Sequence, residues 1–322
     1  MSMPAANDRL EIRLAITYDY HVKVQSIQML VAIADAGTIR GAADKLGKSQ
    51  PALTKALHEA EQDLGVSLFV RSPRGVVLTE WGERVISRAR TIASEMGRLD
   101  EDIKQLRGEQ IGTINIALSP LASIRIIPGA LVNFRQKFPN VEVRLTDGLF
   151  QTKLKPLREG LLDLLIGPIP PPEMAHEIAV EHLVDTQIGI ITAANSPFVN
   201  ARSLRELVKA HWVIAGHLSP GEDLRQTMLK YGIEGAPTPL TICESYLGTL
   251  TLVSDMGAVT VFPLPVFELI RKSWDIVQIP IQETMKPVRI GLMTRSGHPL
   301  TPACETMVNC IRKQVNVLKS QR

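Results

Sequence analysis

The stretch TIRGAADKLGKSQPALTKALHEAEQDLGVSLFVRSPRGVVLT, from Thr38 to Thr79, decides the fold of the N-terminal part of the chain. Its first segment predicts a short helix from Arg40 to Leu46. Thr38 is a suitable N-cap, because its side-chain oxygen can accept a hydrogen bond from a free N–H of the first turn. Gly47 then ends the helix, since glycine readily adopts the positive φ of the turn that follows.

A second helix is predicted directly after this turn. Ser49 caps it, and Pro51 lies in its first turn, where the missing N–H of proline costs little. Gly65 ends it. Apolar residues recur at helical spacing on one face, which indicates that this face packs inward; they are Leu53, Ala56, Leu57, Ala60 and Leu64.

The two helices and their short turn form a helix-turn-helix, which places its second helix in the major groove of DNA. The polar face of that helix could donate to base edges or phosphates. A solvated helix face is the alternative, but the caps, the small residues and the turn spacing all favour DNA contact. The predicted contact residues are Thr38, Lys48, Ser49, Gln50, Pro51, Thr54, Lys55 and His58.

A hairpin is predicted after the second helix. The runs 66–70 and 76–78 are β-prone, and the segment RSPRG between them (residues 71–75) contains the proline and glycine of a turn. We expect Arg71 and Arg74 at the tip of this wing, where they would contact phosphates and position the protein without reading sequence. Ordinary surface charge is the alternative interpretation of both arginines.

The segment LGKSQPALTKALHEAEQDLGVSLFVRSPRGVVLTEWG (46–82) resembles the N-terminal signature of LysR-type transcriptional regulators, most clearly in SQPAL and LGVSLFVR. Weaker motifs extend the resemblance over residues 23–320. It implies a winged helix-turn-helix over 23–79, a linker helix over 80–108 and an effector-binding domain over 112–322. Residues 1–22 form an N-terminal extension whose role stays open.

The linker is predicted as one helix, because no proline occurs from Glu80 to Leu106, Thr79 can cap it and Gly108 ends it. Its apolar residues recur in steps of four and three; they are Val85, Ala89, Ile92, Met96, Leu99, Ile103 and Leu106. Such a heptad pattern predicts a coiled coil and hence a homodimer. The alternative is an amphipathic helix packed on its own domain. A dimer presents two recognition helices, so the operator should be an interrupted palindrome.

After Gly112, β-prone runs alternate with helical runs, which predicts βαβ units and parallel sheets. The expected fold is therefore a multidomain α/β protein with a bilobed effector domain. Lobe I is expected over about 112–185 and 287–322, and lobe II over about 186–286. Strands are expected at 113–119, 141–148, 163–167, 188–193, 212–216, 239–243, 257–263 and 287–294. Helices are expected at 124–138, 153–160, 204–208, 222–232, 246–255 and 301–319.

A ligand is expected between the two lobes, because ligands of open α/β sheets lie beyond the carboxyl ends of strands. Ser119 ends a strand and precedes a helix, so free N–H groups there could hold a carboxylate or sulfonate; a plain N-cap is the alternative. The predicted effector-contact residues are Ser119, Pro120, Leu121, Thr146, Gly167, Pro168, Gly216, His217, Leu218 and Phe262. Arg125 is the one arginine near this cleft, and it could equally point outward.

The family resemblance implies a lobed domain like that of periplasmic solute-binding proteins, with a small organic acid as effector. SPLASIRIIPGAL, TDGLFQTKLKPLREGLLDLLIGP and CESYLGTL are most similar to members that govern degradation of aromatic acids or sulfonates. The resemblance also implies a homotetramer built from two dimers, and RNA polymerase is kept as a candidate partner. Dimer and tetramer, and activation and repression, stay open as alternatives.

Composition sets further bounds. The 322 residues carry a net charge of only +3, so the expectation of DNA binding rests on where the basic residues lie and not on the net charge of the whole chain. No apolar run reaches the ~18 residues of a membrane span, and no signal peptide is evident, so a cytoplasmic protein without membrane contact is expected. Three cysteines fit a reducing compartment. Neither a metal nor a cofactor is expected. The rival hypothesis is an enzyme or small-molecule-binding protein whose N-terminal domain serves protein contacts.

Overall fold

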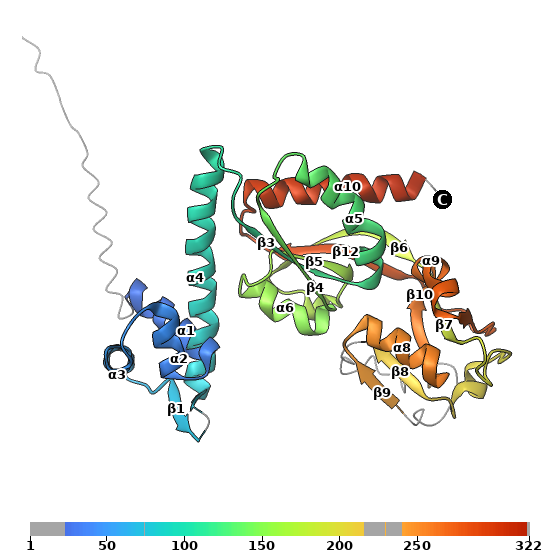
Figure 1. Cartoon of the computed structure of the whole chain (residues 1–322), viewed down its shortest axis with the longest axis horizontal. Coiled ribbons are helices and arrows are strands. Elements are labelled where there is room, and N and C mark those ends of the chain that lie inside the picture. The colour runs from blue at the N-terminus through green and yellow to red at the C-terminus, as the bar shows by residue number, and fades with distance from the viewer. Residues whose placement is uncertain (1–22, 74, 216–228, 230–239, 321–322) are drawn as a thin grey trace, which may run out of the picture. The chain divides into compact units, whose positions relative to one another are not determined.

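The computed structural model describes residues 23–73, 75–215, 229 and 240–320, and Figure 1 shows the chain as a ribbon. The chain divides into two compact units, with the boundary between Ala89 and Arg90 inside a long helix. Each unit has a hydrophobic core of its own. In the described part of the chain, no helix is both long and apolar enough to cross a lipid bilayer.

The first unit is a winged helix-turn-helix. It consists of α1 (Val24–Ala36), α2 (Ile39–Leu46), α3 (Gln50–Leu64), β1 (Phe69–Ser72), β2 (Gly75–Leu78) and the start of α4 (Glu80–Leu106). Leu30 and Ile33 of α1 pack with Leu53 of α3 and Ile86 of α4 in one buried cluster. The predicted helices and their ends are confirmed, with Gly47 and Gly65 in the left-handed conformation at the two C-caps.

The wing differs in detail from the prediction. β1 begins at Phe69 and not at Val66, because the backbone N–H of Val66 donates to the Glu61 carbonyl at the end of α3. The expectation that Arg71 lies at the tip is wrong, since it pairs with Val76 within the hairpin. The other expected tip residue, Arg74, lies outside the described residues.

Lobe I of the second unit contains a five-stranded sheet. Its order is β4 (Glu142–Asp147), β3 (Thr113–Leu118), β5 (Leu164–Pro168), β12 (Val288–Arg295) and β6 (Ile178–Thr186). β3 is parallel to β4 and β5, as the βαβ pattern predicts, whereas β12 is antiparallel to both β5 and β6. The prediction that the strand near residue 290 returns to lobe I is confirmed. β6 was not predicted.

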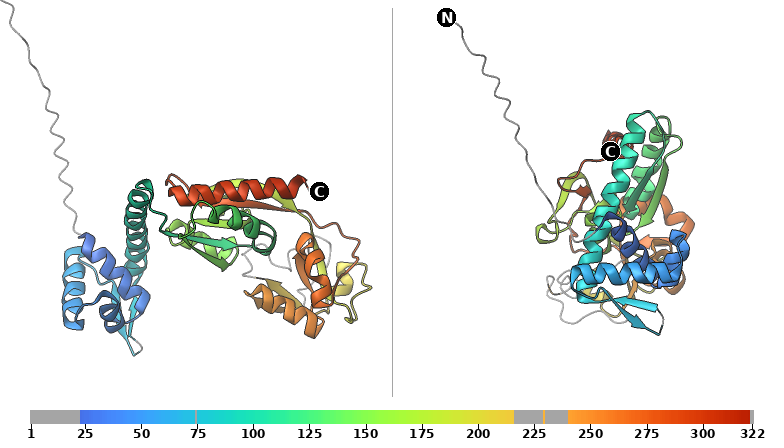
Figure 2. Two further views of the ribbon diagram at one scale, coloured as in Figure 1. Left: turned by 45° about the horizontal axis from the view of Figure 1, so that its top comes forward. Right: turned by 90° about the vertical axis from the view of Figure 1, so that its left-hand side faces the viewer.

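Helices cover both faces of this sheet. α5 (Ile127–Arg135) and α10 (Pro302–Ser320) lie on one face and α6 (Phe150–Arg158) on the other (Figures 1 and 2). Ile116 packs in the core under α5 and α10, whereas the next residue, Ala117, packs under α6. Strands covered on both faces are apolar throughout, and this explains the nearly continuous apolar sequence of β3 and β5.

Lobe II is smaller and less regular. β7 (Ile188–Ala193) lies between β10 (Thr260–Pro263) and β11 (Ile276–Gln278), and β8 (Trp212–Ala215) pairs with β9 (Leu240–Cys243). The parallel pairing expected here holds for β8 with β9 and for a bridge between Trp212 and Val259, whereas β7 enters directly from β6 and runs opposite to both of its neighbours.

The helices of lobe II are α8 (Tyr246–Met256) and α9 (Leu264–Trp274); the second was not predicted, nor was β11. The helix expected at 204–208 is a single 3-10 turn, Leu204–Leu207, and another such turn spans Pro172–Met174. The helix expected at 222–232 lies outside the described residues, except for position 229.

Candidate functional site

The turn of the helix-turn-helix is held by its caps. The Thr38 hydroxyl accepts a hydrogen bond from the Gly41 N–H at 3.0 Å, and the Ser49 hydroxyl accepts one from the Ala52 N–H at 3.4 Å. Both cap predictions are confirmed. Thr38 is half-buried, so its hydroxyl serves the turn, whereas Ser49 is exposed at the start of α3.

The outer face of α3 presents most of the predicted contact residues to solvent. Lys48, Gln50, Pro51, Lys55 and His58 are exposed. Thr54 is half-buried and donates its hydroxyl to the Gln50 carbonyl at 2.9 Å. Lys55 lies 3.7 Å from the Glu59 carboxylate, and His58 contacts Gln62 at 3.1 Å. Exposed pairs of this kind are weak, so these side chains can exchange their partners for a ligand at little cost.

Backbone contacts fix the wing against the helices. The Val76 N–H donates to the Gly37 carbonyl at 2.8 Å. Gly75 has φ +135°, and a Cβ there would lie 2.2 Å from the Gly37 oxygen. The Glu61 carboxylate accepts from the N–H groups of Leu68 and Phe69 at 2.6 and 3.1 Å, a contact that the sequence did not reveal. The exposed Arg71 is therefore held in place beside α3.

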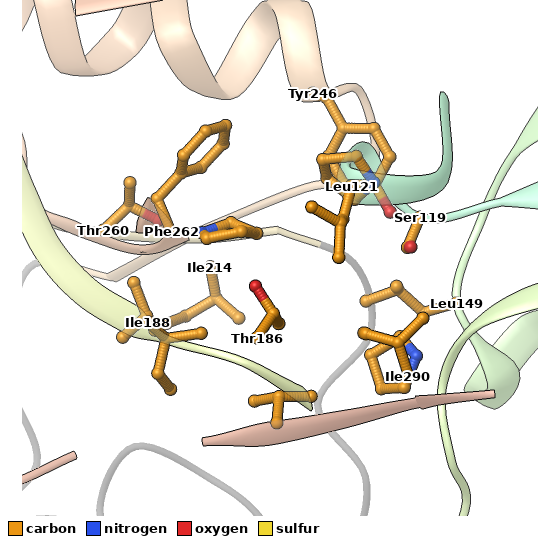
Figure 3. A pocket seen from close by; sticks show the side chains of 15 residues that line it. Ser119, Leu121, Leu149, Thr186, Ile188, Ile214, Tyr246, Thr260, Phe262 and Ile290 are labelled. Atoms are coloured by element: carbon orange, nitrogen blue, oxygen red, sulfur yellow. The ribbon is translucent and has the colours of Figure 1, made fainter. Parts of the chain in front are cut away.

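A cavity of about 220 Å³ lies between the lobes of the second unit (Figure 3). The two crossings between the lobes supply Thr186 of β6, Ile188 of β7, and Val288 and Ile290 of β12, and Val288 pairs with Thr186. The full lining is Ser119, Pro120, Leu121, Leu149, Pro168, Thr186, Ile188, Ile214, Tyr246, Thr260, Val261, Phe262, Pro263, Val288 and Ile290. A ligand here would contact both lobes at once.

Five predicted effector residues line this cavity: Ser119, Pro120, Leu121, Pro168 and Phe262.

Two predicted residues do not line it. Thr146 is exposed within the edge strand β4, and Leu149, three residues further along, reaches the cavity instead. Gly167 supports the wall from behind, because a Cβ at this position would lie 3.3 Å from the Ser119 Cβ. Gly216, His217 and Leu218 lie outside the described residues.

The cavity is apolar except for hydroxyl groups. Ser119 Oγ, Tyr246 Oη and Thr260 Oγ1 are buried, and within the described residues none has a hydrogen-bond partner. Thr186 donates only a long 3.5 Å bond to the Gln187 carbonyl. Burial, with a contribution from Asp147, raises the pKa of Tyr246, so its hydroxyl stays a donor at neutral pH. Buried polar groups without partners are unfavourable and mark sites completed by a ligand or water.

Sequence reasoning missed Thr186, Tyr246 and Thr260. Tyr246 is the first residue of α8 and follows the N-cap Ser245. Ser245 lies between a strand and a helix, as Ser119 does, so the reasoning applied to Ser119 could have indicated this segment too. Thr260 lies at the start of β10, whereas the prediction considered only the end of that strand.

The helix after Ser119 is irregular. The Ser119 N–H donates to the Ile166 carbonyl at 2.8 Å, which ties this residue to β5. A π-helical turn (Ala122–Ile126) follows before α5, and such turns are frequent at functional sites. Arg125, within this turn, does not line the cavity; it faces a smaller groove together with Lys319 of α10.

One face of α4 is bonded to lobe I. Arg98 donates from Nη2 to the Asp163 carboxylate at 2.9 Å, and Glu95 forms an ion pair with Arg295. The Gln105 amide donates to the Ile111 carbonyl and accepts from the Ala303 N–H, both at 2.9 Å. From Ser94 onward, the helix is thus anchored by polar contacts.

The predicted heptad residues of α4 separate into two groups. Val85 and Ala89 are partly or fully buried in the first unit. The remaining five form an exposed apolar stripe: Ile92, Met96, Leu99, Ile103 and Leu106. An exposed stripe of this length on one helix is suited to a partner helix.

Two protein-family models match the chain. Residues 24–83 match the bacterial regulatory helix-turn-helix protein, lysR family, and residues 107–316 match the LysR substrate binding domain.

Curated relatives span most of the chain. The HTH-type transcriptional regulator GalR of Pseudomonas putida is 26% identical over 301 residues, which cover 92% of this chain and 75% of that protein. TdcA of Escherichia coli K12, also named an HTH-type transcriptional regulator, is 23% identical over 90% of this chain and 93% of its own.

Solved structures share the fold. CbnR, a LysR family transcriptional regulator, superposes with a TM-score of 0.64 at 21% identity, covering 91% of this chain and 99% of that one. Full-length CbnR complexed with its target DNA superposes with a TM-score of 0.62 at 22% identity, covering 91% of this chain and all of that one.

Proposed function

The chain belongs to the LysR family of DNA-binding transcriptional regulators, and on that premise we propose that α3 and its wing read an operator while the cavity senses a small organic acid. Because the family consists of regulators and not enzymes, the rival hypothesis of an enzyme is set aside. The proposal that the second unit binds an effector rests on one observation. This observation is the cavity, whose buried hydroxyls have no partners within the described residues.

The DNA-reading half rests on the capped and exposed start of α3. Gln50, Pro51, Thr54 and Lys55 are assigned to base edges, because the N-terminal residues of a recognition helix enter the major groove. Arg71 and Arg74 are assigned to phosphates. The bonds from Leu68 and Phe69 to Glu61 support this division, since they fix the start of β1, the strand that contains Arg71, against α3.

We further propose that the protein binds DNA as a dimer formed through α4. The stripe from Ile92 to Leu106 would pack against the same stripe of a second copy, so two recognition helices meet two half-sites of an interrupted palindrome. Assembly of two such dimers into a homotetramer is part of the proposal, as are action in the cytoplasm and contact with RNA polymerase.

We assign the effector to aromatic carboxylates or sulfonates and the target to an operon for their breakdown. A cavity of about 220 Å³ with apolar walls suits a single ring. Ser119 Oγ and the start of the helix behind it offer donors to an acidic group, because backbone N–H groups are unpaired at a helix N-terminus.

Two neighbouring strands connect the cavity with α4. β5 ends at Pro168, which lines the cavity, and the residue before its other end is Asp163, the partner of Arg98. β12 begins at Val288, which lines the cavity, and ends at Arg295, the partner of Glu95. Ligand-induced movement of these strands would shift the linker helix, so effector and DNA affinities become reciprocally coupled.

Electrophoretic mobility shift and footprinting on the DNA upstream of the protein's own gene test the proposal. We expect protection of an interrupted palindrome, with a footprint that changes when one acid from a panel of benzoates and benzenesulfonates is added. Gln50→Ala and Lys55→Ala should each weaken specific binding, whereas Lys313→Ala, an exposed change on α10, should not. Absence of specific protection at low salt would refute the DNA-reading assignment; a footprint unaffected by every acid would refute only the effector class.

A further inference from the structure

Of the three cavity hydroxyls that have no partner within the described residues, those of Ser119 and Thr260 stand at opposite ends of the cavity. Figure 3 shows Ser119 at one end and Thr260 at the other, with Ile214 and Leu121 among the apolar residues between them. Ser119 belongs to lobe I and is 2% exposed, and Thr260 belongs to lobe II and is 1% exposed. Neither hydroxyl has a hydrogen-bond partner in the described part of the chain.

Thr192, a threonine in the same sheet, has a buried hydroxyl whose hydrogen bond is made within the protein. Thr192 of β7 is fully buried, and its Oγ1 donates to the carbonyls of Gly257 and Ala258 at 3.1 and 3.0 Å. Thr260, in the adjacent strand β10, faces the cavity instead. Because valine has nearly the same shape and no polar atom to bury, Thr260 is less favourable than valine unless something in the cavity meets its hydroxyl.

From this pair we infer that Thr260 is a specificity-determining residue, which binds a second polar substituent of the effector. The inference rests on the proposed function and deepens it. The effector is then a ring-sized acid whose acidic group lies at the Ser119 end and whose hydroxyl, carbonyl or second acidic group reaches Thr260. An unsubstituted aromatic acid would leave the Thr260 hydroxyl unpaired and bind more weakly, as sites built to bond a polar group reject analogues that lack it.

The arrangement also explains how both lobes would recognise one molecule. A ligand bonded at Ser119 and at Thr260 bridges the two lobes across the crossing strands at Thr186 and Val288. A ligand held at Ser119 but not at Thr260 meets lobe II through apolar surface and the Tyr246 hydroxyl. The second substituent therefore adds a polar contact to lobe II at Thr260.

The first test measures stability without any ligand. Thr260→Val should unfold at the same temperature as the native protein or higher, because the variant removes a buried hydroxyl that has no hydrogen-bond partner among the described residues. Thr192→Val is the matched control and should lower the unfolding temperature, since it removes the hydroxyl that donates to the Ala258 carbonyl, whereas the Gly257 carbonyl keeps Ser196 Oγ as a donor. A loss of stability in Thr260→Val equal to that of the control would overturn the inference, because it would show that the hydroxyl has a structural partner.

The second test measures affinity by calorimetry for benzoate, 3-hydroxybenzoate and 4-hydroxybenzoate. We expect the full-length protein to bind one hydroxybenzoate about three to ten times more tightly than benzoate, the range of one net hydrogen bond. Thr260→Val should abolish this preference by weakening the binding of that hydroxybenzoate. Ser119→Ala should weaken all three acids.

The outcomes separate the inference from the proposed function. Benzoate binding without preference for either hydroxybenzoate, or a preference that survives Thr260→Val, overturns the role of Thr260 alone. Binding of none of the three acids, with operator binding intact, overturns the inference together with the effector class and leaves the regulator assignment standing.

Discussion

Arg98 donates a hydrogen bond from its Nη2 to the Asp163 carboxylate at 2.9 Å and thereby joins the linker helix to the residue that precedes β5. Both side chains are largely buried, at 13% and 14% exposure. Asp163 also accepts from the Asn115 N–H at 2.8 Å, so one carboxylate connects α4, β3 and β5. The contact makes α4 a structural part of the effector domain as well as a linker.

Arg98→Ala should destabilise the second unit by about 3 kcal/mol, because removing one partner of a buried ion pair leaves the other charge uncompensated. Urea unfolding followed by circular dichroism measures this. Arg144→Ala is the control, since Arg144 and Glu142 are both exposed and such pairs contribute about 0–1 kcal/mol. Equal effects of the two changes would show that the Arg98 contact does not hold the helix.

His298 should make stability depend on pH. Burial and the nearby guanidinium groups of Arg295 and Arg98 lower the pKa of His298 below its usual 6.5, even though Glu95 lies 3.5 Å from Nδ1. The unfolded chain then binds the proton more readily than the folded one, so stability falls as the pH drops through 6.5 toward the lower folded pKa.

His298→Gln should remove this contribution. We expect the fall in unfolding temperature between pH 7.5 and pH 5 to be smaller in the variant than in the native protein. The pH dependence of Arg144→Ala serves as the control, and an unchanged fall in His298→Gln would contradict the prediction.

Two glycines of α4 should respond oppositely to alanine. A Cβ at Gly82 would lie 2.0 Å from the Leu68 carbonyl oxygen, so Gly82→Ala should cost about 1–3 kcal/mol and weaken operator binding through a displaced wing. Gly97 has open space around its Cα, so Gly97→Ala should stabilise the helix by about 0.5–1 kcal/mol. Thermal unfolding of both variants decides this, and a stable, DNA-binding Gly82→Ala would disprove the tight approach.

Leu99→Asp should dissociate the proposed dimer. Leu99 is 61% exposed in the single chain and lies in the middle of the α4 stripe. Since each copy loses a leucine worth about 2 kcal/mol when buried, the dissociation constant should rise roughly a hundredfold or more. Sedimentation velocity measures the assembly state, with Arg88→Ala, exposed on the same helix, as the control. A Leu99→Asp protein that stays dimeric would place the interface elsewhere.

Arg71→Ala should weaken binding to every DNA sequence by a similar factor. If Arg71 contacts one phosphate, the slope of log affinity against log salt should decrease by about 0.9. Fluorescence anisotropy with operator and scrambled duplexes at several salt concentrations tests this, and Lys313→Ala should leave the slope unchanged. A loss confined to the operator would instead assign Arg71 to a base.

The N-terminal unit could be predicted closely from the sequence because its determinants are local. The Thr38 and Ser49 caps bond to N–H groups three residues away, and Gly47 and Gly65 adopt the left-handed conformation that ends each helix. Such interactions depend on neighbours along the chain, so they can be read from spacing. The position of Arg71 could not be predicted in this way. It depends on the residue at which β1 begins, and that residue is set by the contacts at the end of α3.

The cavity between the lobes was only partly predictable, because it is assembled from distant parts of the chain. Ser119 was found, since it ends a strand before a helix. Thr146 was misplaced, because strand-end reasoning did not account for its position within the edge strand β4.

The sequence by itself determined the capped helix-turn-helix, the linker helix and the alternating elements, since each follows from contacts within a few residues. Only the tertiary structure decided which hydroxyls share a cavity and which charges anchor α4. Ser119 and Thr260 are separated by more than a hundred residues and Arg98 and Asp163 by 65. Their proximity follows from strand order, the two lobe crossings and sheet register, which are properties of the packed chain that local sequence does not encode.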